Sequence, residues 1–136
     1  MIYTFYSYKG GVGRTMALAN IAELFYQAGL KVLIVDWDLE APGLERFFSI
    51  DQEKILEKRG IVDLLLGYKE QMSKDMFIKE DEDLPFEKPG NLITDIYPNS
   101  TESGKLYILT AGKRSKDYFE KYANAVLNFD WQDFLK

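Results

Sequence analysis

The residues of this chain best suited to chemistry lie in two short segments near its amino terminus. Residues 8–15 have the sequence Tyr-Lys-Gly-Gly-Val-Gly-Arg-Thr, which combines three glycines with two cations and a hydroxyl. Glycines permit a tight turn whose backbone N–H groups point inward with no side chain in the way, an arrangement that suits a phosphate. The second segment contains Asp36 and Asp38. Carboxylates and a threonine hydroxyl are hard oxygen ligands, which magnesium on a nucleotide prefers.

These residues need particular elements to position them. Residues 2–7 are β-branched and aromatic, which predicts a strand before the loop. Residues 16–28 are apolar at helical spacing and are followed by Gly29, which predicts a helix that begins at the loop and ends at the glycine. Residues 31–35 form a continuous apolar run, which predicts a second parallel strand. Because ligands bind at the carboxyl ends of parallel strands, we expect Asp36 and Asp38 beside the loop.

The rest of the chain predicts a smaller set of elements. Strand-like runs at residues 92–97 and 105–111 flank a turn-rich segment, which favours an antiparallel hairpin. Helical spacing predicts a helix through Ile61 and Tyr68, one capped by Ser115, and a last one capped by Asp130.

Two charged segments of the chain can be interpreted as solvated surface, and the second of them also as part of a functional site. The acidic run at residues 79–83 is interpreted as solvated surface. Lys113 and Arg114 follow the run at 105–111, and they lie either near phosphates or a partner, or in a solvated loop.

The loop departs from the usual phosphate-loop sequence at two positions. Tyr8 replaces the first glycine of G-x-x-x-x-G-K-[ST], and Arg14 replaces its lysine. With Lys9 at its start, the loop resembles the deviant Walker A sequence Lys-Gly-Gly-x-Gly-Lys-Thr of the MinD, ParA and nitrogenase iron-protein P-loop ATPases. Within that family it resembles a bacterial branch with a Lys-Gly-Gly-Val-Gly-Arg loop. The resemblance covers mainly residues 1–48 and 105–114.

This resemblance implies a fold and a domain organisation. The fold would be α/β, a P-loop three-layer sandwich with a mostly parallel sheet of three parallel strands and an antiparallel addition, flanked by helices. Residues 1–136 would be the amino-terminal part of the nucleotide-binding domain, incomplete at its carboxyl-terminal end.

The resemblance also implies a ligand and residue roles. The protein would bind ATP with Mg²⁺ and act as an ATPase-type molecular switch. Thr15 would ligate the metal, Asp36 would support the metal site, and Asp38 would orient the attacking water. Lys9 would reach the nucleotide of a facing subunit, which implies a homodimer with nucleotide at the interface. The phosphates would be held by Gly10, Gly11, Val12, Gly13, Arg14 and Thr15.

Two other hypotheses stay open. A dinucleotide-binding fold is suggested by Gly11 and Gly13 as the first glycines of G-x-G-x-x-G, although Met16 stands where the third would be. A regulatory or interaction module that binds nucleotide without turnover, a pseudo-ATPase, is suggested by Arg14. Its planar guanidinium cannot take the place of an ammonium.

Composition narrows the possible chemistry. The 136 residues suffice for one domain, and 46% of them are hydrophobic. The absence of cysteine and histidine excludes thiol and imidazole catalysis and leaves the groups used in phosphoryl transfer. A net charge of −5 argues against a dominant attraction to nucleic acid or an anionic membrane. With no basic-apolar leader and no long apolar run, we expect a cytoplasmic protein. The sequence does not identify any further protein partner.

Overall fold

The computed structural model of the chain describes residues 1–72, 89–127, 129 and 131–134. The acidic run at 79–83 and the cap at Asp130 lie outside these residues. Among the helices of the described ranges, none is both long enough and apolar enough to cross a membrane. In chain order the elements are α1 (Arg14–Gln27), β1 (Lys31–Val35), η1 (Leu44–Phe47), α2 (Gln52–Leu56), α3 (Ile61–Met72), α4 (Pro89–Leu92), β2 (Ile93–Asp95), β3 (Lys105–Leu109), α5 (Tyr118–Val126) and α6 (Trp131–Phe134).

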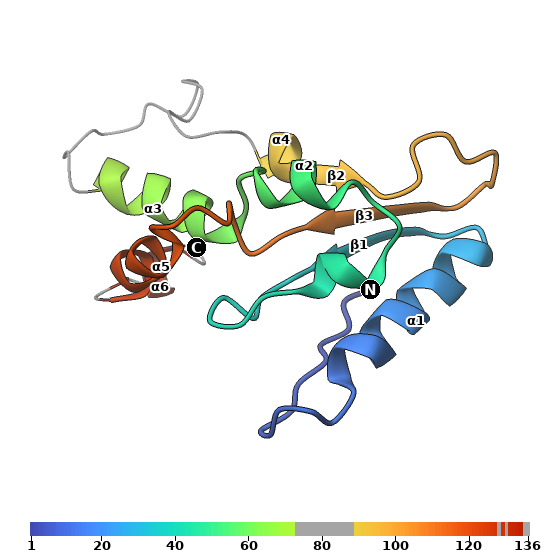
Figure 1. Cartoon of the computed structure of the whole chain (residues 1–136), viewed down its shortest axis with the longest axis horizontal. Coiled ribbons are helices and arrows are strands. Elements are labelled where there is room, and N and C mark those ends of the chain that lie inside the picture. Colours follow the sequence, from blue (N-terminus) through green and yellow to red (C-terminus); the bar gives the residue numbers. More distant parts are fainter. Residues whose placement is uncertain (73–88, 128, 130, 135–136) are drawn as a thin grey trace.

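The described strands form one small mixed sheet in the order β1-β3-β2 (Figure 1). β1 and β3 are parallel, with Lys31 opposite Lys105 and Val35 opposite Leu109. β2 pairs with β3 antiparallel, so the predicted hairpin is confirmed. The described part of the chain is thus compatible with a partial P-loop α/β fold, with two parallel strands in the sheet where the sequence suggested three.

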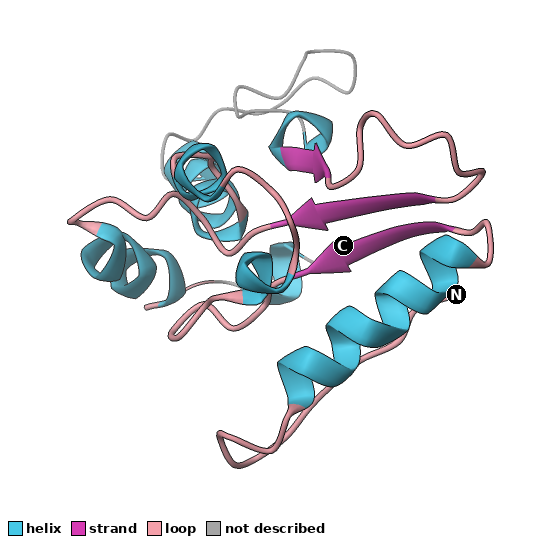
Figure 2. Ribbon diagram, turned by 45° about the vertical axis from the view of Figure 1, so that its right-hand side comes forward, coloured by secondary structure: helices cyan, strands magenta, loops and turns pink. Residues whose placement is uncertain are grey.

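The missing parallel strand is the predicted one at residues 2–7, and that prediction is wrong. The segment has no strand structure, and it runs along α1 as an irregular chain (Figure 2). The ring of Tyr3 lies 5.7 Å from the ring of Phe25 on α1, while Ile2 and Tyr6 are largely exposed. Strand propensity depends on pairing with a neighbouring strand. Within the described residues, β1 forms its ladder with β3 alone.

Helix α1 confirms the helix expected after the loop. Gly13 stands just before it with φ 77°, and Gly29 follows it with φ 82°. At the carboxyl end the N–H of Leu30 donates to the carbonyl of Phe25 at 3.0 Å, so a left-handed glycine ends the helix as predicted. Ala19, Ala22 and Tyr26 are buried against the sheet. The helix begins two residues before the expected start because Arg14 and Thr15 already have helical backbone.

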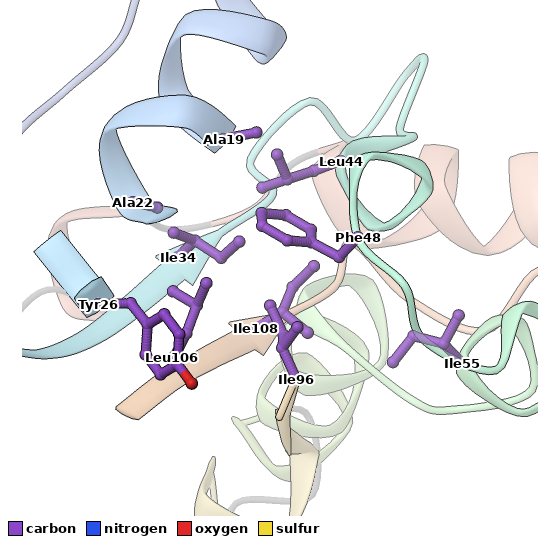
Figure 3. Packing of buried hydrophobic residues seen from close by; sticks show 10 residues of the cluster. All are labelled: Ala19, Ala22, Tyr26, Ile34, Leu44, Phe48, Ile55, Ile96, Leu106 and Ile108. Carbon is purple, nitrogen blue, oxygen red and sulfur yellow. The ribbon is translucent and has the colours of Figure 1, made fainter. Parts of the chain in front are cut away.

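Two clusters of buried side chains form the core. The first lies between α1 and the sheet, where the ring of Phe48 points toward Ile34 and lies beneath Leu44 (Figure 3). The second joins α3 to α5 and includes Leu39, Leu65, Ala111 and Tyr118. Helix α3 confirms the prediction at residues 61–68. Asp117, instead of the predicted Ser115, stands at the N-cap position of helix α5, and its side chain makes no capping hydrogen bond.

The close approach of α1 to the start of β3 gives a test of the fold. A Cβ added to Gly104 would overlap the backbone carbonyl of Tyr26, so we expect Gly104→Ala to lower the free energy of unfolding by about 1–3 kcal/mol. Urea denaturation measures this change. Gly90→Ala is the control because an added Cβ there meets nothing within 4 Å. Equal stability of the two variants would contradict the close packing.

Candidate functional site

The glycine loop is an open turn. Gly11 and Gly13 have φ values of 73° and 77°, a left-handed conformation that side chains other than glycine rarely adopt. A Cβ added at Gly10, Gly11 or Gly13 would meet nothing within 4 Å. Residues 10 and 11 form a tight turn, and within the described part of the chain the N–H groups of Gly10, Gly11 and Gly13 donate to no backbone carbonyl. The loop therefore leaves these backbone N–H groups available to a ligand.

These donors continue into the amino-terminal end of α1. The first N–H groups of any helix lack acceptors within the helix, and the helix dipole makes that end positive. Thr15 lies in the first turn of the 14-residue α1. Loop and helix end together suit an anion such as a phosphate group.

A cavity of about 1040 Å³ brings the end of the loop and the two acids together. Its lining includes Arg14, Thr15, Asp36 and Asp38, and also apolar residues from the amino-terminal segment, α1 and β1. Residues 9–13 are not part of this lining. Lys9 is exposed, and its backbone carbonyl accepts the hydroxyl of Ser7 at 3.0 Å.

Asp36 organises the segment that follows β1, which we call the acid loop (residues 36–47). Its side chain is 5% exposed. It accepts the N–H groups of Asp38 at 3.2 Å, Gly43 at 3.0 Å and Leu44 at 3.1 Å. A carboxylate has about four acceptor sites, so one remains for a further donor such as a metal-bound water.

Burial raises the pKa of Asp36 above its ordinary value of 3.8. The three N–H bonds act in the opposite direction and lower this pKa, and the charge of Glu45 adds a smaller rise. Folding therefore favours the protonated form. The contribution of Asp36 to stability declines as the pH rises from 3.8 through the higher folded-state pKa.

Asp38 is bound to Arg14 of the glycine loop. The guanidinium Nη2 donates to Oδ2 of Asp38 at 2.6 Å, and the N–H of Ala41 donates to the other oxygen at 3.1 Å. Both side chains are about one third exposed, so water screens the pair and its net stabilisation is about 1 kcal/mol or less. Arg14 can therefore exchange Asp38 for another anion at small cost.

The structure pairs charged residues that the sequence analysis did not connect. Glu45 is buried and lies 3.5 Å from Arg114. Lys113 binds Glu57 at 2.7 Å. Neither Lys113 nor Arg114 lines the cavity at the glycine loop, so the position near phosphates is not confirmed. Both residues lie in a loop after β3, where Lys113 is partly exposed and Arg114 is mostly buried. The signal for Glu45 was a charged residue inside the apolar run from Leu44 to Phe48.

The oxygen ligands fit magnesium only together with phosphates. In the described residues, no group of three or more acidic, histidine or cysteine side chains is placed to hold a metal ion. Magnesium in nucleotide sites keeps several waters and uses one or two protein oxygens plus the phosphates. The hydroxyl of Thr15 and the remaining acceptor site of Asp36 meet that requirement.

One comparison with known proteins found a family. The family model described as ParA: NUBPL iron-transfer P-loop NTPase matches residues 1–93. That range contains the glycine loop, α1, β1 and the acid loop, and it is more than half of the chain. No curated protein and no solved structure matches the chain.

The hydrogen bonds of Asp36 generate a prediction about stability. Asp36→Ala leaves the N–H groups of Asp38, Gly43 and Leu44 without their acceptor, so we expect a loss of about 2 kcal/mol or more in the free energy of unfolding. Asp38→Ala is the matched control, with an expected change within about 1 kcal/mol. Both are measured by denaturant unfolding at neutral pH. A larger loss for Asp38→Ala than for Asp36→Ala would show that Asp36 does not organise the acid loop.

Proposed function

Because the chain belongs to the ParA: NUBPL iron-transfer P-loop NTPase family, we propose that it binds ATP with magnesium at its deviant glycine loop and acts as an ATPase-type molecular switch. Membership of a P-loop NTPase family points to nucleotide binding. The observation that supports the site most directly is the common cavity of Thr15, Asp36 and Asp38 at the start of α1. The N–H groups of Gly10, Gly11 and Gly13, which donate to no backbone carbonyl in the described part of the chain, add phosphate donors.

In this proposal each residue acts through the group that the structure leaves available. The N–H groups of residues 10–15 bind the phosphate oxygens, and the guanidinium of Arg14 can bind two of them at once. The Thr15 hydroxyl is the protein ligand of the metal, and Asp36 holds one of its waters. Magnesium supplies charge neutralisation on the phosphates.

Arg14 links phosphate binding to the state of Asp38. The guanidinium binds Asp38 at 2.6 Å in this structure, and a phosphate group, with more negative charge, competes for the same donors. Exchange of Asp38 for phosphate frees a carboxylate oxygen, which can then accept a hydrogen bond from the attacking water. The Arg14–Asp38 pair would thus make water activation depend on nucleotide binding.

The iron-transfer part of the family description does not enter this proposal. Iron–sulfur groups are held mainly by cysteine thiolates, and these 136 residues contain no cysteine and no histidine. The proposal therefore concerns nucleotide binding and turnover.

A homodimer with nucleotide at the interface is the second part of the proposal. Lys9 is exposed at the open turn, where it can reach a facing subunit. Three apolar side chains around the loop, Tyr8, Val12 and Met16, are also more than half exposed. Exposed apolar groups that cluster near a site are typical of protein interfaces.

The alternative function is a nucleotide-binding switch without turnover. The Arg14–Asp38 pair favours this alternative if phosphate does not displace Asp38 from Arg14, because Asp38 is then not released to accept the attacking water. The two functions are distinguished by measuring ATP affinity and the rate of phosphate release on the same protein. If the pair blocks turnover, we expect tight ATP binding with no phosphate release, and Arg14→Lys should not lower affinity but should raise the rate. Turnover by the unmodified protein that is lost in Asp38→Ala would exclude this alternative.

The phosphate site itself is tested by calorimetry with magnesium and ATP. Gly13→Val introduces a β-branched side chain at φ 77°, and Thr15→Ala removes the hydroxyl ligand. We expect the combined variant to lose ATP binding. Thr15→Ser, which keeps the hydroxyl, should retain most of the affinity. Unchanged binding in a folded combined variant would put the phosphates elsewhere.

The dimer is tested by sedimentation with a non-hydrolysable ATP analogue. We expect the protein to form a dimer only with the analogue, and Lys9→Ala to stay monomeric while it still binds nucleotide. Lys31→Ala, at the exposed start of β1, is the control and should dimerise normally. A dimer in Lys9→Ala as stable as the unmodified one would remove Lys9 from the interface.

A further inference from the structure

A buried carboxylate with too few partners lies just behind the proposed nucleotide site. Glu45 is 1% exposed, and both of its carboxylate oxygens lack a hydrogen-bond donor within the described part of the chain. Its nearest cation is Arg114, whose Nη2 lies 3.5 Å from Oε1. An isolated buried charge is very costly, and the guanidinium of Arg114 is the nearby opposite charge that compensates the Glu45 carboxylate.

Glu45 directly follows the two residues that close the acid loop on Asp36. The two residues before Glu45, Gly43 and Leu44, donate the N–H groups that bind Oδ2 of Asp36 at 3.0 and 3.1 Å. A side chain held at residue 45 therefore restrains the chain immediately after these two N–H groups. The ion pair to Arg114 is the polar contact that holds it.

A second contact joins the same parts of the chain. The hydroxyl of Tyr118 donates to the carbonyl of Leu39 in the acid loop at 2.9 Å. The guanidinium of Arg114 lies 5.0 Å from the centre of the Tyr118 ring, a cation–π distance. Arg114 thus contacts both Glu45 and the ring that holds Leu39. Two contacts, Glu45–Arg114 and Leu39–Tyr118, therefore connect the acid loop to the residues that follow β3. We call this connection the fastening of the loop.

We propose that Arg114 is a positioning residue for the acid loop. Through Glu45 and Tyr118 it holds residues 36–47 in the conformation in which Asp36 and Asp38 share a cavity with Thr15. The link between this conformation and magnesium rests on the proposed function. The fastening of the loop does not, because it is formed by residues of the chain alone.

Hydrogen exchange of single amides tests the fastening without nucleotide. In Arg114→Gln we expect the amides of Gly43 and Leu44 to exchange about tenfold faster or more, while amides of the β1–β3 ladder such as Tyr107 change much less. Lys113→Gln is the matched control, because Lys113 binds the mostly exposed Glu57. It should leave exchange in the acid loop unchanged. Faster exchange of the whole chain, or none at Gly43 and Leu44, would overturn the proposal.

The buried charge allows a second, internal control. Loss of one partner of a buried ion pair leaves an uncompensated charge, whereas loss of both removes that penalty. We therefore expect Glu45→Gln combined with Arg114→Gln to exchange more slowly at Gly43 and Leu44 than Arg114→Gln alone. Arg114→Lys keeps the charge and should retain part of the protection if Arg114→Gln does not fold. Additive effects of the two changes would show that Glu45 and Arg114 do not act as a pair.

Measuring the affinity for magnesium in the presence of ATP tests whether the fastening of the acid loop matters for function. Changes to residues that orient metal ligands weaken metal binding by about tenfold or more, and we expect this loss in Arg114→Gln with magnesium-free ATP binding unchanged. A normal magnesium dependence in Arg114→Gln would overturn the role toward the site. If the unmodified protein bound no ATP, the proposed function would fail, while hydrogen exchange would still decide whether Arg114 fastens the loop.

Discussion

The buried carboxylate of Asp36 is the interaction on which the candidate site depends. It ends β1 and at the same time accepts three N–H groups from the next eight residues. One side chain thus converts the end of a strand into a closed loop. The cost of burying the charge appears as the raised pKa of Asp36. Asp38 and Ala41, which lie between Asp36 and Gly43, are held within this closed loop.

The acid loop also connects the two halves of the core. Leu44 packs in the cluster between α1 and the sheet, and Leu39 packs in the cluster between α3 and α5. A change in the loop therefore disturbs both clusters, and a change in either cluster can reach Asp36. Through this arrangement a residue as distant in the sequence as Arg114 would act on the site, as we propose.

Local sequence patterns were sufficient to predict the elements that are determined by residues close together in the chain. The strand at residues 31–35, the helix ended by Gly29 and the helix at Ile61 were all predicted because periodicity and a glycine stop act within one turn or strand. The strand at residues 2–7 was not formed, because strand formation depends on a neighbour that no local pattern reveals. The pairs Arg14–Asp38 and Glu45–Arg114 join residues far apart in the chain. Charge type alone could not indicate which cation meets which acid.

The parallel pairing of β1 with β3 has a consequence for the order of folding. Lys31 lies opposite Lys105, so this ladder closes a loop of roughly 70 residues, with an entropic cost that must be met before its contacts form. Helices such as α1 and α3 need only local contacts and can form sooner. The acid loop and Arg114 follow β1 and β3 directly in the chain. The site behind Asp36 is therefore assembled when the slowest, most non-local contact of the sheet is made, and it would be absent from any intermediate that has helices but no ladder.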